Sequence, residues 1–248
     1  MNRFFLTPDD FSGNKVFFPA DISHQVIHVL RLPEGEIVAV LDNHGSRYEV
    51  AVHFDDKNKQ VIGTILQVKS VASARKVDVA LYFGLSNREK VEWILQKGTE
   101  LGISAFHPFI SSRTLVQSKE LPAKKLARWN RIIREAAEQS HQGYLATLNP
   151  PVDLQTGFSN ATAANHLSLI AWEEAAMAES KLRQLLTQFN GSTIALFIGP
   201  EGGFSEGEIG LARACGCQVV SLGDSILRME TAAIVLPALV FYELRCGE

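Results

Sequence analysis

Two polar loops near the C-terminus carry the residues best placed to do chemistry. The first loop, residues 198–205, reads Ile-Gly-Pro-Glu-Gly-Gly-Phe-Ser, and the second, residues 222–232, reads Leu-Gly-Asp-Ser-Ile-Leu-Arg-Met-Glu-Thr-Ala. Each follows an apolar run typical of a buried strand and leads into a helical pattern. Because ligands of open α/β sheets bind at the carboxyl ends of strands, the two loops predict one shared ligand site.

The first loop is rich in glycine, which lets the backbone approach a ligand closely. Five of the twelve residues from 199 to 210 are glycine. The loop lacks the Gly-Lys-Ser/Thr ending of a phosphate-binding P-loop and does not fit Gly-x-Gly-x-x-Gly. Its free backbone amides therefore favour a neutral or zwitterionic nucleoside ligand over ATP. Ser205 and Glu208 form a capping-box pair, which predicts the start of the next helix.

Charge is distributed unevenly along the 248 residues, whose net charge is −3. Between Arg75 and Arg134 there are twelve basic residues against five acidic ones, a balance of +7, so the rest of the chain carries −10. A basic segment in an acidic chain is typical of a phosphate-binding face, although solvated helix faces can also be basic. Arg88 and Arg131 belong to this segment and are expected to contact phosphate groups.

Residues 1–72 read mostly as short strands separated by turns, with one amphipathic helix over residues 21–32. The expected strands cover residues 15–18, 36–41, 47–54 and 60–69. This pattern predicts a small β-barrel domain. Near residues 70–75 the pattern changes from short strands to alternating strands and helices. This change predicts a linker there, with a second domain over residues 75–248.

In the second domain, strands and helices alternate, which predicts an α/β fold with a largely parallel sheet. Ser86 and Glu89 stand in capping-box spacing, so a helix is expected to begin after Ser86. The expected strands are 77–83, 106–110, 167–172, 193–198 and 218–222, and the expected helices are 88–101, 123–141, about 175–189 and a last one reaching about residue 244.

Several function classes are disfavoured by composition. No apolar run approaches membrane-spanning length and the N-terminus lacks the apolar core of a signal peptide, which predicts a cytoplasmic protein. Cys215, Cys217 and Cys246 are too few and too clustered for a disulfide framework, and they are expected to be reduced and inert. The seven histidines show no metal-binding spacing, so no metal is expected.

Four segments resemble one known family. Residues 84–102, the Glu-Gln-Ser at 138–140, the loop 198–205 and the segment 226–232 are similar to motifs of the bacterial 16S ribosomal RNA uridine-N3 methyltransferases. These enzymes belong to the SPOUT superfamily of S-adenosylmethionine-dependent RNA methyltransferases. The N-terminal Arg3-Phe4-Phe5 and residues 28–31 resemble the family's small PUA-like domain, so the resemblance runs nearly end to end.

The resemblance implies a C-terminal trefoil knot that binds S-adenosyl-L-methionine, a homodimer, and 16S ribosomal RNA within the small ribosomal subunit as partner. Ordinary topology rules would not have suggested a knot. By motif match, the implied cofactor-binding residues are Leu169, Ala171, Trp172, Gly199, Glu201, Gly202, Leu222, Gly223, Ile226, Leu227, Arg228, Glu230, Thr231 and Ala232. The implied RNA-facing residues are Asn87, Lys90, Lys97, Glu100, Arg113 and Gln139.

Three residues in two of the motifs depart from the family pattern. Met229 stands where the family typically has threonine, which is expected to alter only packing within the loop. His141 and Gln142 follow Glu-Gln-Ser where the family commonly has Gly-Arg, so one expected RNA-binding cation is missing.

Methyl transfer to uridine N3 requires the imino proton to leave while the methyl group arrives. N3 lies on the Watson–Crick edge, so the base must be unpaired or flipped out. Glu201 or Glu230 is expected to accept the proton and Arg228 to stabilise the uridine anion, which makes these three the candidate catalytic residues. The alternative is that Glu230 and Arg228 only brace the fold.

Three other functions fit some of these residues. One is methylation at a different RNA position, and another is RNA binding without catalysis. The third is a hydrolase, because Gly-Asp-Ser-Ile-Leu at 223–227 resembles the nucleophile block of GDSL esterases. That block lies near the N-terminus in those esterases, whereas here it lies near the C-terminus and no histidine follows it.

Overall fold

The structure is a computed structural model that describes residues 1–55, 60–70, 77–164, 167–175 and 182–245. The chain divides into two compact units. Unit 1 contains residues 1–74 and 137–145, and unit 2 contains residues 75–136 and 146–248. Residues 137–145, which the sequence placed in the second domain, therefore pack with unit 1. Most of the linker expected at 70–75 lies outside the described residues.

Unit 1 is built on a six-stranded sheet with the order β1-β4-β5-β6-β3-β2 in its described residues. β1 runs parallel to β4, and the other neighbouring pairs are antiparallel. The elements are β1 (Arg3–Phe5), the 3-10 turn η1 (Pro8–Asp10), β2 (Phe11–Ser12), β3 (Lys15–Phe17), α1 (Ala20–His24), the π-helical turn η2 (Gln25–Val29), β4 (Ile37–Leu41), β5 (Ser46–Asp55) and β6 (Gln60–Ser70).

The two faces of this sheet pack against different partners. Phe4 belongs to the larger core, which α1 and η2 cover through Ile22 and Val26. Phe5, the next residue, points to the opposite face because strand side chains alternate. There it packs against Ala137, with Leu41 and Leu145 completing the cluster. This contact explains why residues 137–145 group with unit 1.

Two local features of unit 1 differ from expectation. The helix expected over residues 21–32 is shorter, because α1 passes into the π-helical turn and Arg31 then adopts a positive φ of 50°. Strand β1 was not predicted, since three residues give too little alternation to identify a strand.

Unit 2 is an α/β unit whose neighbouring strands are parallel throughout its described sheet of seven strands. The strand order is β10-β8-β7-β12-β11-β13, with β9 paired to β8. The elements are β7 (Asp78–Gly84), α2 (Arg88–Leu101), β8 (Ala105–Ile110), α3 (Ala123–Gln139), β9 (Thr147–Leu148), β10 (Val152–Asp153), α4 (Leu154–Ala163), β11 (Leu167–Ala171), α5 (Leu182–Thr187), β12 (Thr193–Ile198), α6 (Glu206–Ala214), β13 (Gln218–Val220) and α7 (Met229–Arg245).

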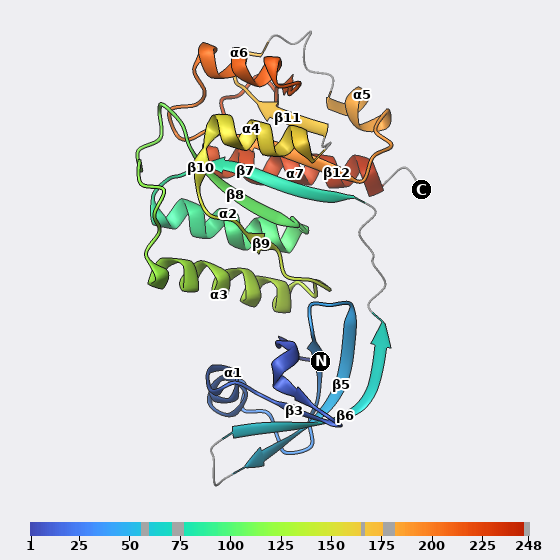
Figure 1. The fold of residues 1–248 in the computed structure, drawn as a ribbon. Helices are drawn as coiled ribbons and strands as arrows, with labels where there is room; N and C mark the ends of the chain where they lie inside the picture. The colour runs from blue at the N-terminus through green and yellow to red at the C-terminus, as the bar shows by residue number, and fades with distance from the viewer. Residues whose placement is uncertain (56–59, 71–76, 165–166, 176–181, 246–248) are drawn as a thin grey trace. The chain divides into compact units, whose positions relative to one another are not determined.

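Helices cover both faces of the unit 2 sheet. α2, α3, α5 and α7 contribute to one hydrophobic core, and α4 and α6 contribute to the other. In Figure 1, α2 and α3 lie on one side of the strands and α4 and α6 on the other. Strands buried on both faces explain the near-continuous apolar runs in the sequence.

The parallel α/β class and most of its elements agree with the sequence prediction. Ser205 caps α6 with the expected capping box to Glu208. The predicted cap at Ser86 is wrong, because Asn87 caps α2 by accepting a hydrogen bond from the amide of Lys90. Helix α4 was not predicted, and part of the helix expected at 175–189 lies outside the described residues.

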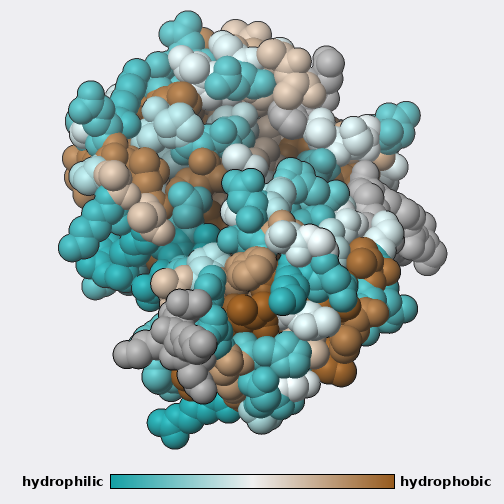
Figure 2. All heavy atoms as spheres, turned by 60° about the horizontal axis from the view of Figure 1, so that its bottom comes forward, coloured by the Kyte–Doolittle hydropathy of each residue, from teal (hydrophilic) through white to brown (hydrophobic). Residues whose placement is uncertain are grey.

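Within the described residues, no helix is both long and apolar enough to cross a membrane. Figure 2 shows one face of the molecule, on which hydrophilic residues predominate and hydrophobic residues form separate patches. Cys217 is buried, and burial, together with the charge of Cys215, raises the pKa of its thiol to about 12. This thiol stays protonated at neutral pH and is a poor nucleophile, while Cys246 lies outside the described residues.

Candidate active site

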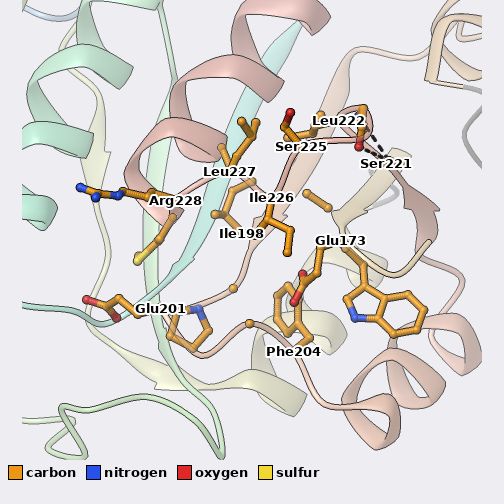
Figure 3. Close-up of a pocket in the computed structure, with 18 of the residues that line it drawn as sticks. Glu173, Ile198, Glu201, Phe204, Ser221, Leu222, Ser225, Ile226, Leu227 and Arg228 are labelled. Carbon is orange, nitrogen blue, oxygen red and sulfur yellow. Dashed lines mark hydrogen bonds between the residues drawn. The ribbon is translucent and has the colours of Figure 1, made fainter.

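The two loops predicted to carry chemistry meet in one pocket of unit 2, at the carboxyl ends of β11, β12 and β13 (Figure 3). The pocket has a volume of about 340 Å³, within the range that small-molecule sites occupy. Its lining residues are Lys90, Ala171, Trp172, Glu173, Ile198, Gly199, Pro200, Glu201, Gly203, Phe204, Ser221, Leu222, Gly223, Ser225, Ile226, Leu227, Arg228, Met229 and Ala232.

The loop after β12 turns sharply at Gly203, which has a φ of 66°. Its amide donates a hydrogen bond of 2.9 Å to the carbonyl oxygen of Pro200. A Cβ at Gly203 would lie 2.6 Å from the carboxylate oxygen Oε1 of Glu173, so the loop and this carboxylate are in close contact. Gly84 is equally constrained, because a Cβ there would lie 2.6 Å from the backbone nitrogen of Pro200.

Two side chains hold this loop from outside the pocket. Arg113 Nη1 donates hydrogen bonds to the carbonyl oxygens of Gly202 at 2.9 Å and Phe204 at 3.3 Å. Glu208 accepts hydrogen bonds from the amide of Ser205 at 2.8 Å and from the amide of Ser112 at 2.9 Å. The segment after β8 thus fixes the position of the glycine-rich loop.

The loop after β13 forms the opposite wall of the pocket. Gly223 has a φ of 112°, and its amide and carbonyl both hydrogen-bond to the hydroxyl of Ser221. Ile226 is 83% exposed although it lines the pocket, so this apolar side chain is available to a ligand. Figure 3 places Glu173 next to Phe204, and Glu201 with Arg228 at the other end.

Four polar residues meet at the Glu201 end of the pocket. The hydroxyl of buried Ser86 donates a hydrogen bond to Glu201 Oε1, and Lys90 Nζ donates to the same oxygen at 3.2 Å. Lys90 Nζ also lies 3.7 Å from Glu230 Oε2. One ammonium group therefore lies between two carboxylates, and we call these four residues the Lys90 cluster.

The two carboxylates of the Lys90 cluster have different surroundings. Burial alone would raise the pKa of Glu201, but hydrogen bonds from Ser86, from its own backbone amide and from Lys90 outweigh burial and lower this pKa. Glu230 Oε2 is buried and accepts no hydrogen bond from any described residue. Glu201 is thus held as the anion, whereas Glu230 retains an unused acceptor.

Most residues implied to bind the cofactor do line the pocket, but four do not. Leu169 is fully buried in the core on the α2 side of the sheet, because it lies in the middle of β11, two residues before the end of the strand. Gly202 is exposed, and a Cβ there would lie 3.0 Å from the Cβ of Arg113, outside the pocket lining. Glu230 and Thr231, in the first turn of α7, are also outside the lining. The sequence missed Glu173 and Ser221, although Glu173 directly follows the predicted strand 167–172 and Ser221 lies inside the predicted strand 218–222, which the structure ends at Val220.

The residues expected to contact RNA do not form one free cationic face. Among the described residues, several of these cations are already paired with carboxylates. Asn87 caps α2, Gln139 is exposed at the end of α3, and Arg113 binds the glycine-rich loop. The ion pairs are Arg88 with Glu92 at 2.8 Å, Lys90 with Glu201 at 3.2 Å, Lys97 with Glu100 at 2.7 Å and Arg131 with Glu135 at 3.0 Å.

The pocket does not offer the groups that a serine hydrolase needs. Ser225 lines the pocket, but no histidine is among the described lining residues, so no Ser/His pair forms there. Nowhere in the described part of the chain do three or more histidine, cysteine or acidic residues gather as metal ligands would.

A parallel α/β unit with a glycine-rich pocket at its strand ends defines a nucleoside- or cofactor-binding enzyme domain. The sequence model of one protein family, the RNA methyltransferase domain, matches residues 73–240. The chain belongs to this family.

Known members resemble the chain over most of its length. The Ribosomal RNA small subunit methyltransferase E of Synechocystis sp. is 33% identical, over 94% of this chain and 75% of the relative. The protein of the same name from Bacillus subtilis is 28% identical, over 89% of this chain and 87% of the relative.

Solved structures agree with this assignment. The Neisseria gonorrhoeae Ribosomal RNA small subunit methyltransferase E bound to S-adenosyl methionine is 28% identical, with a TM-score of 0.83 over 98% of this chain and 97% of the other. A Legionella pneumophila methyltransferase in complex with S-adenosyl methionine is 30% identical, with a TM-score of 0.84 over 97% and 96%.

Proposed function

We propose that this protein transfers the methyl group of S-adenosyl-L-methionine to N3 of a uridine in 16S ribosomal RNA of the small ribosomal subunit. The observation that carries the proposal is the pocket between the loops after β12 and β13, in a chain that belongs to the RNA methyltransferase family. The names of the relatives support the RNA substrate, and the two related structures that contain the cofactor support the methyl donor.

The lining of the pocket fits this methyl donor. Ile198, Phe204 and Leu227 provide apolar surface for an adenosine group, and the backbone of two glycine-bearing loops is exposed for close approach. Glu173 provides a carboxylate for a cationic group, next to Phe204 (Figure 3). S-adenosyl-L-methionine supplies an electrophilic methyl group on a positively charged sulfur.

The Lys90 cluster distinguishes the two candidate bases. Glu201 receives hydrogen bonds from Ser86 and Lys90 that stabilise its ionised form, so it is a weak proton acceptor. Glu230 receives no hydrogen bond at Oε2 from the described residues. We therefore propose Glu230, whose side chain is 21% exposed beside Lys90, as the proton acceptor. Because Glu230 lies outside the pocket lining, the uridine would have to approach it from the Lys90 side. Glu201 then serves to orient Lys90.

The cation of Arg228, at the Glu201 end of the pocket, completes the proposed site. Loss of the N3 proton leaves negative charge on the uridine ring, which a preorganised cation stabilises. The guanidinium of Arg228 is exposed, and Figure 3 shows it at the Glu201 end of the pocket. The N3 edge of the uridine must enter unpaired, since a paired base would hide it.

The proposal extends to the organisation of the chain. Residues 1–72 are proposed to form a PUA-like β-barrel that binds RNA, and residues 75–248 a SPOUT domain with a trefoil knot. A homodimer in the cytoplasm is the proposed working form. The RNA-facing residues would be Asn87, Arg88, Lys90, Lys97, Glu100, Arg113, Arg131 and Gln139.

Two measurements test the proposed function. Calorimetry should detect binding of S-adenosyl-L-methionine to the purified protein. In a strain that lacks the gene, nucleoside mapping of 16S ribosomal RNA should show loss of one N3-methyluridine, and the intact gene should restore it. Loss of a different methylated nucleoside would assign the enzyme to another RNA position, and an unchanged RNA would refute the proposal.

A further inference from the structure

Three cations gather on one face of the unit 1 sheet. In the strand register, Arg3 of β1 pairs with Ala39 of β4, and Ala39 pairs with Glu49 of β5. Two residues before Glu49 on β5, Arg47 pairs with Lys69 of β6. Positions two residues apart on a strand, and positions paired across strands, share a face. Arg3, Arg47 and Lys69 therefore project from the same side, and we call them the β-sheet cation patch.

The acidic partners of this patch are few. Lys69 Nζ lies 2.7 Å from Glu49, whereas Arg47 Nη2 reaches the same Glu49 oxygen only at 3.8 Å. Arg3 Nη1 donates to the carbonyl oxygen of His141 at 2.8 Å and has no ion pair among the described residues. The nearby carboxylate of Glu138 accepts a hydrogen bond from the amide of Phe5. Two guanidinium groups are thus incompletely neutralised.

The arrangement is unfavourable for the protein alone. Like charges placed directly opposite each other in a sheet destabilise the pairing, and Arg47 and Lys69 occupy such positions. Arg47 Nε is buried and donates no hydrogen bond to any described residue. Burial, followed by the charge of Arg47, lowers the pKa of Arg3. An anion bound at the patch would relieve this repulsion.

We propose that the β-sheet cation patch binds phosphate groups of the RNA backbone. Guanidinium groups offer paired donors that match phosphate oxygens, and a lysine adds a point charge. The patch lies outside the basic segment between residues 75 and 134, where Arg88, Lys97 and Arg131 already have carboxylate partners within 3.0 Å. This inference rests on RNA being the substrate.

The test compares Arg47→Gln and Lys69→Gln with the parent protein in binding a labelled oligouridylate. Each lost phosphate contact should flatten the dependence of log affinity on log salt by about 0.7 and weaken binding several-fold. Lys15→Gln is the matched control, since Lys15 is an exposed cation on β3 of the same sheet. Its salt dependence should equal that of the parent. Parent-like slopes for both Arg47→Gln and Lys69→Gln would overturn the proposal.

Thermal unfolding separates binding from a structural role. Arg47 and Lys69 repel each other in the free protein. If Arg47 serves phosphate binding and not the fold, its removal relieves this repulsion, and the Tm of Arg47→Gln should match or exceed that of the parent. A lower Tm together with an unchanged salt slope would make Arg47 a structural ion-pair residue and refute the patch. Calorimetry with S-adenosyl-L-methionine keeps the two proposals distinguishable. A parent protein that does not bind S-adenosyl-L-methionine would refute the proposed methyltransferase activity. The dependence of RNA affinity on salt tests the β-sheet cation patch alone.

Discussion

The guanidinium of Arg113 donates a hydrogen bond of 2.9 Å to the carbonyl oxygen of Gly202, so a side chain expected to contact RNA holds the cofactor loop. The two residues are 89 positions apart, and they come together because β7, which lies between β8 and β12, ends beside both loops. This contact links the segment after β8 to the pocket wall.

Arg113→Ala should therefore weaken binding of S-adenosyl-L-methionine. It removes two hydrogen bonds to the loop, each worth about 1.5 to 3 kcal/mol when the donor is charged and less where water competes, so we expect roughly a tenfold loss of affinity. Calorimetry measures the effect. Lys119→Ala, in the same connecting segment, is the control and should bind the cofactor normally. Unchanged affinity in Arg113→Ala would leave Arg113 with a phosphate-binding role only.

Gly203→Ala should damage the pocket more than a substitution at Gly202. Alanine is strained at a φ of 66°, by about 1 to 2 kcal/mol, and its Cβ would press on Glu173 Oε1. The double variant Gly203→Ala with Glu173→Ala removes the clash and keeps the backbone strain. Glu173→Ala removes a carboxylate proposed to bind the cofactor and so weakens binding by itself. In a double-mutant cycle, however, Gly203→Ala should cost less cofactor affinity in the Glu173→Ala background than in the parent.

The control for this cycle is Gly207→Ala. A Cβ there meets nothing within 4 Å, and the residue lies in the first turns of α6, so this variant should fold at least as stably as the parent. Additive effects of the Gly203 and Glu173 substitutions would show that the clash is absent in solution.

Glu230→Gln should lower kcat far more than Glu201→Gln. A general base contributes roughly 10²- to 10⁴-fold, and Glu230 is the carboxylate with an unused acceptor. Binding of S-adenosyl-L-methionine should remain close to that of the parent, because Glu230 does not line the pocket. Single-turnover methylation of a 16S ribosomal RNA fragment measures the rate. A larger loss in Glu201→Gln would reverse the assignment.

Acid should weaken the contact between α2 and α3. Hydrogen bonds from Arg128 and then Arg88 lower the pKa of Glu92 to about 2 against burial. The folded pKa is depressed, so this stabilisation is present above the ordinary pKa of 4.5 and is lost as pH falls from there toward about 2. Because water screens the pair, we expect about 1 kcal/mol or less.

Urea unfolding at pH 7 and at pH 3 checks this prediction. The parent should lose more stability between these conditions than Glu92→Gln, which cannot ionise. The control is Glu206→Gln, an exposed carboxylate in the first turn of α6. A parent and a Glu92→Gln variant with the same pH dependence would contradict the pKa of Glu92.

The site could be predicted from sequence where it depends on local pattern. Buried apolar runs followed by Gly-Pro-Glu-Gly-Gly identify the strand ends, and Ser205 with Glu208 identifies the cap. The roles of Ser86 and Lys90 could not be predicted, because the groups they bind lie more than one hundred residues away along the chain. On spacing alone, Ser86 fits a capping box as well as Ser205 does. Only the tertiary structure directs its hydroxyl to Glu201 instead.

The same limit applies to the fold. The parallel sheet follows from alternating strands and helices, but α4 was missed because glycine, serine and asparagine weaken its helical signal. The grouping of residues 137–145 with unit 1 depends on the contact between Phe5 and Ala137, which no local pattern encodes.

The proposed dimer can be tested on α7. Two apolar residues of this helix, Leu236 and Val240, are fully buried in the core of unit 2 and are not available to a partner. Leu239 and Tyr242 remain 40% and 64% exposed. Exposed apolar residues on a helix that already serves a core are typical of an interface.

Leu239→Asp and Tyr242→Asp should therefore convert the dimer to a monomer, because an interface core does not accept an unpaired charge. Light scattering at micromolar concentration measures the mass. Leu115→Asp is the matched control, since Leu115 is an apolar residue that is 76% exposed in the segment after β8. It should leave the mass unchanged. A monomeric parent, or a dimer that survives both α7 substitutions, would show that Leu239 and Tyr242 face solvent in the working protein.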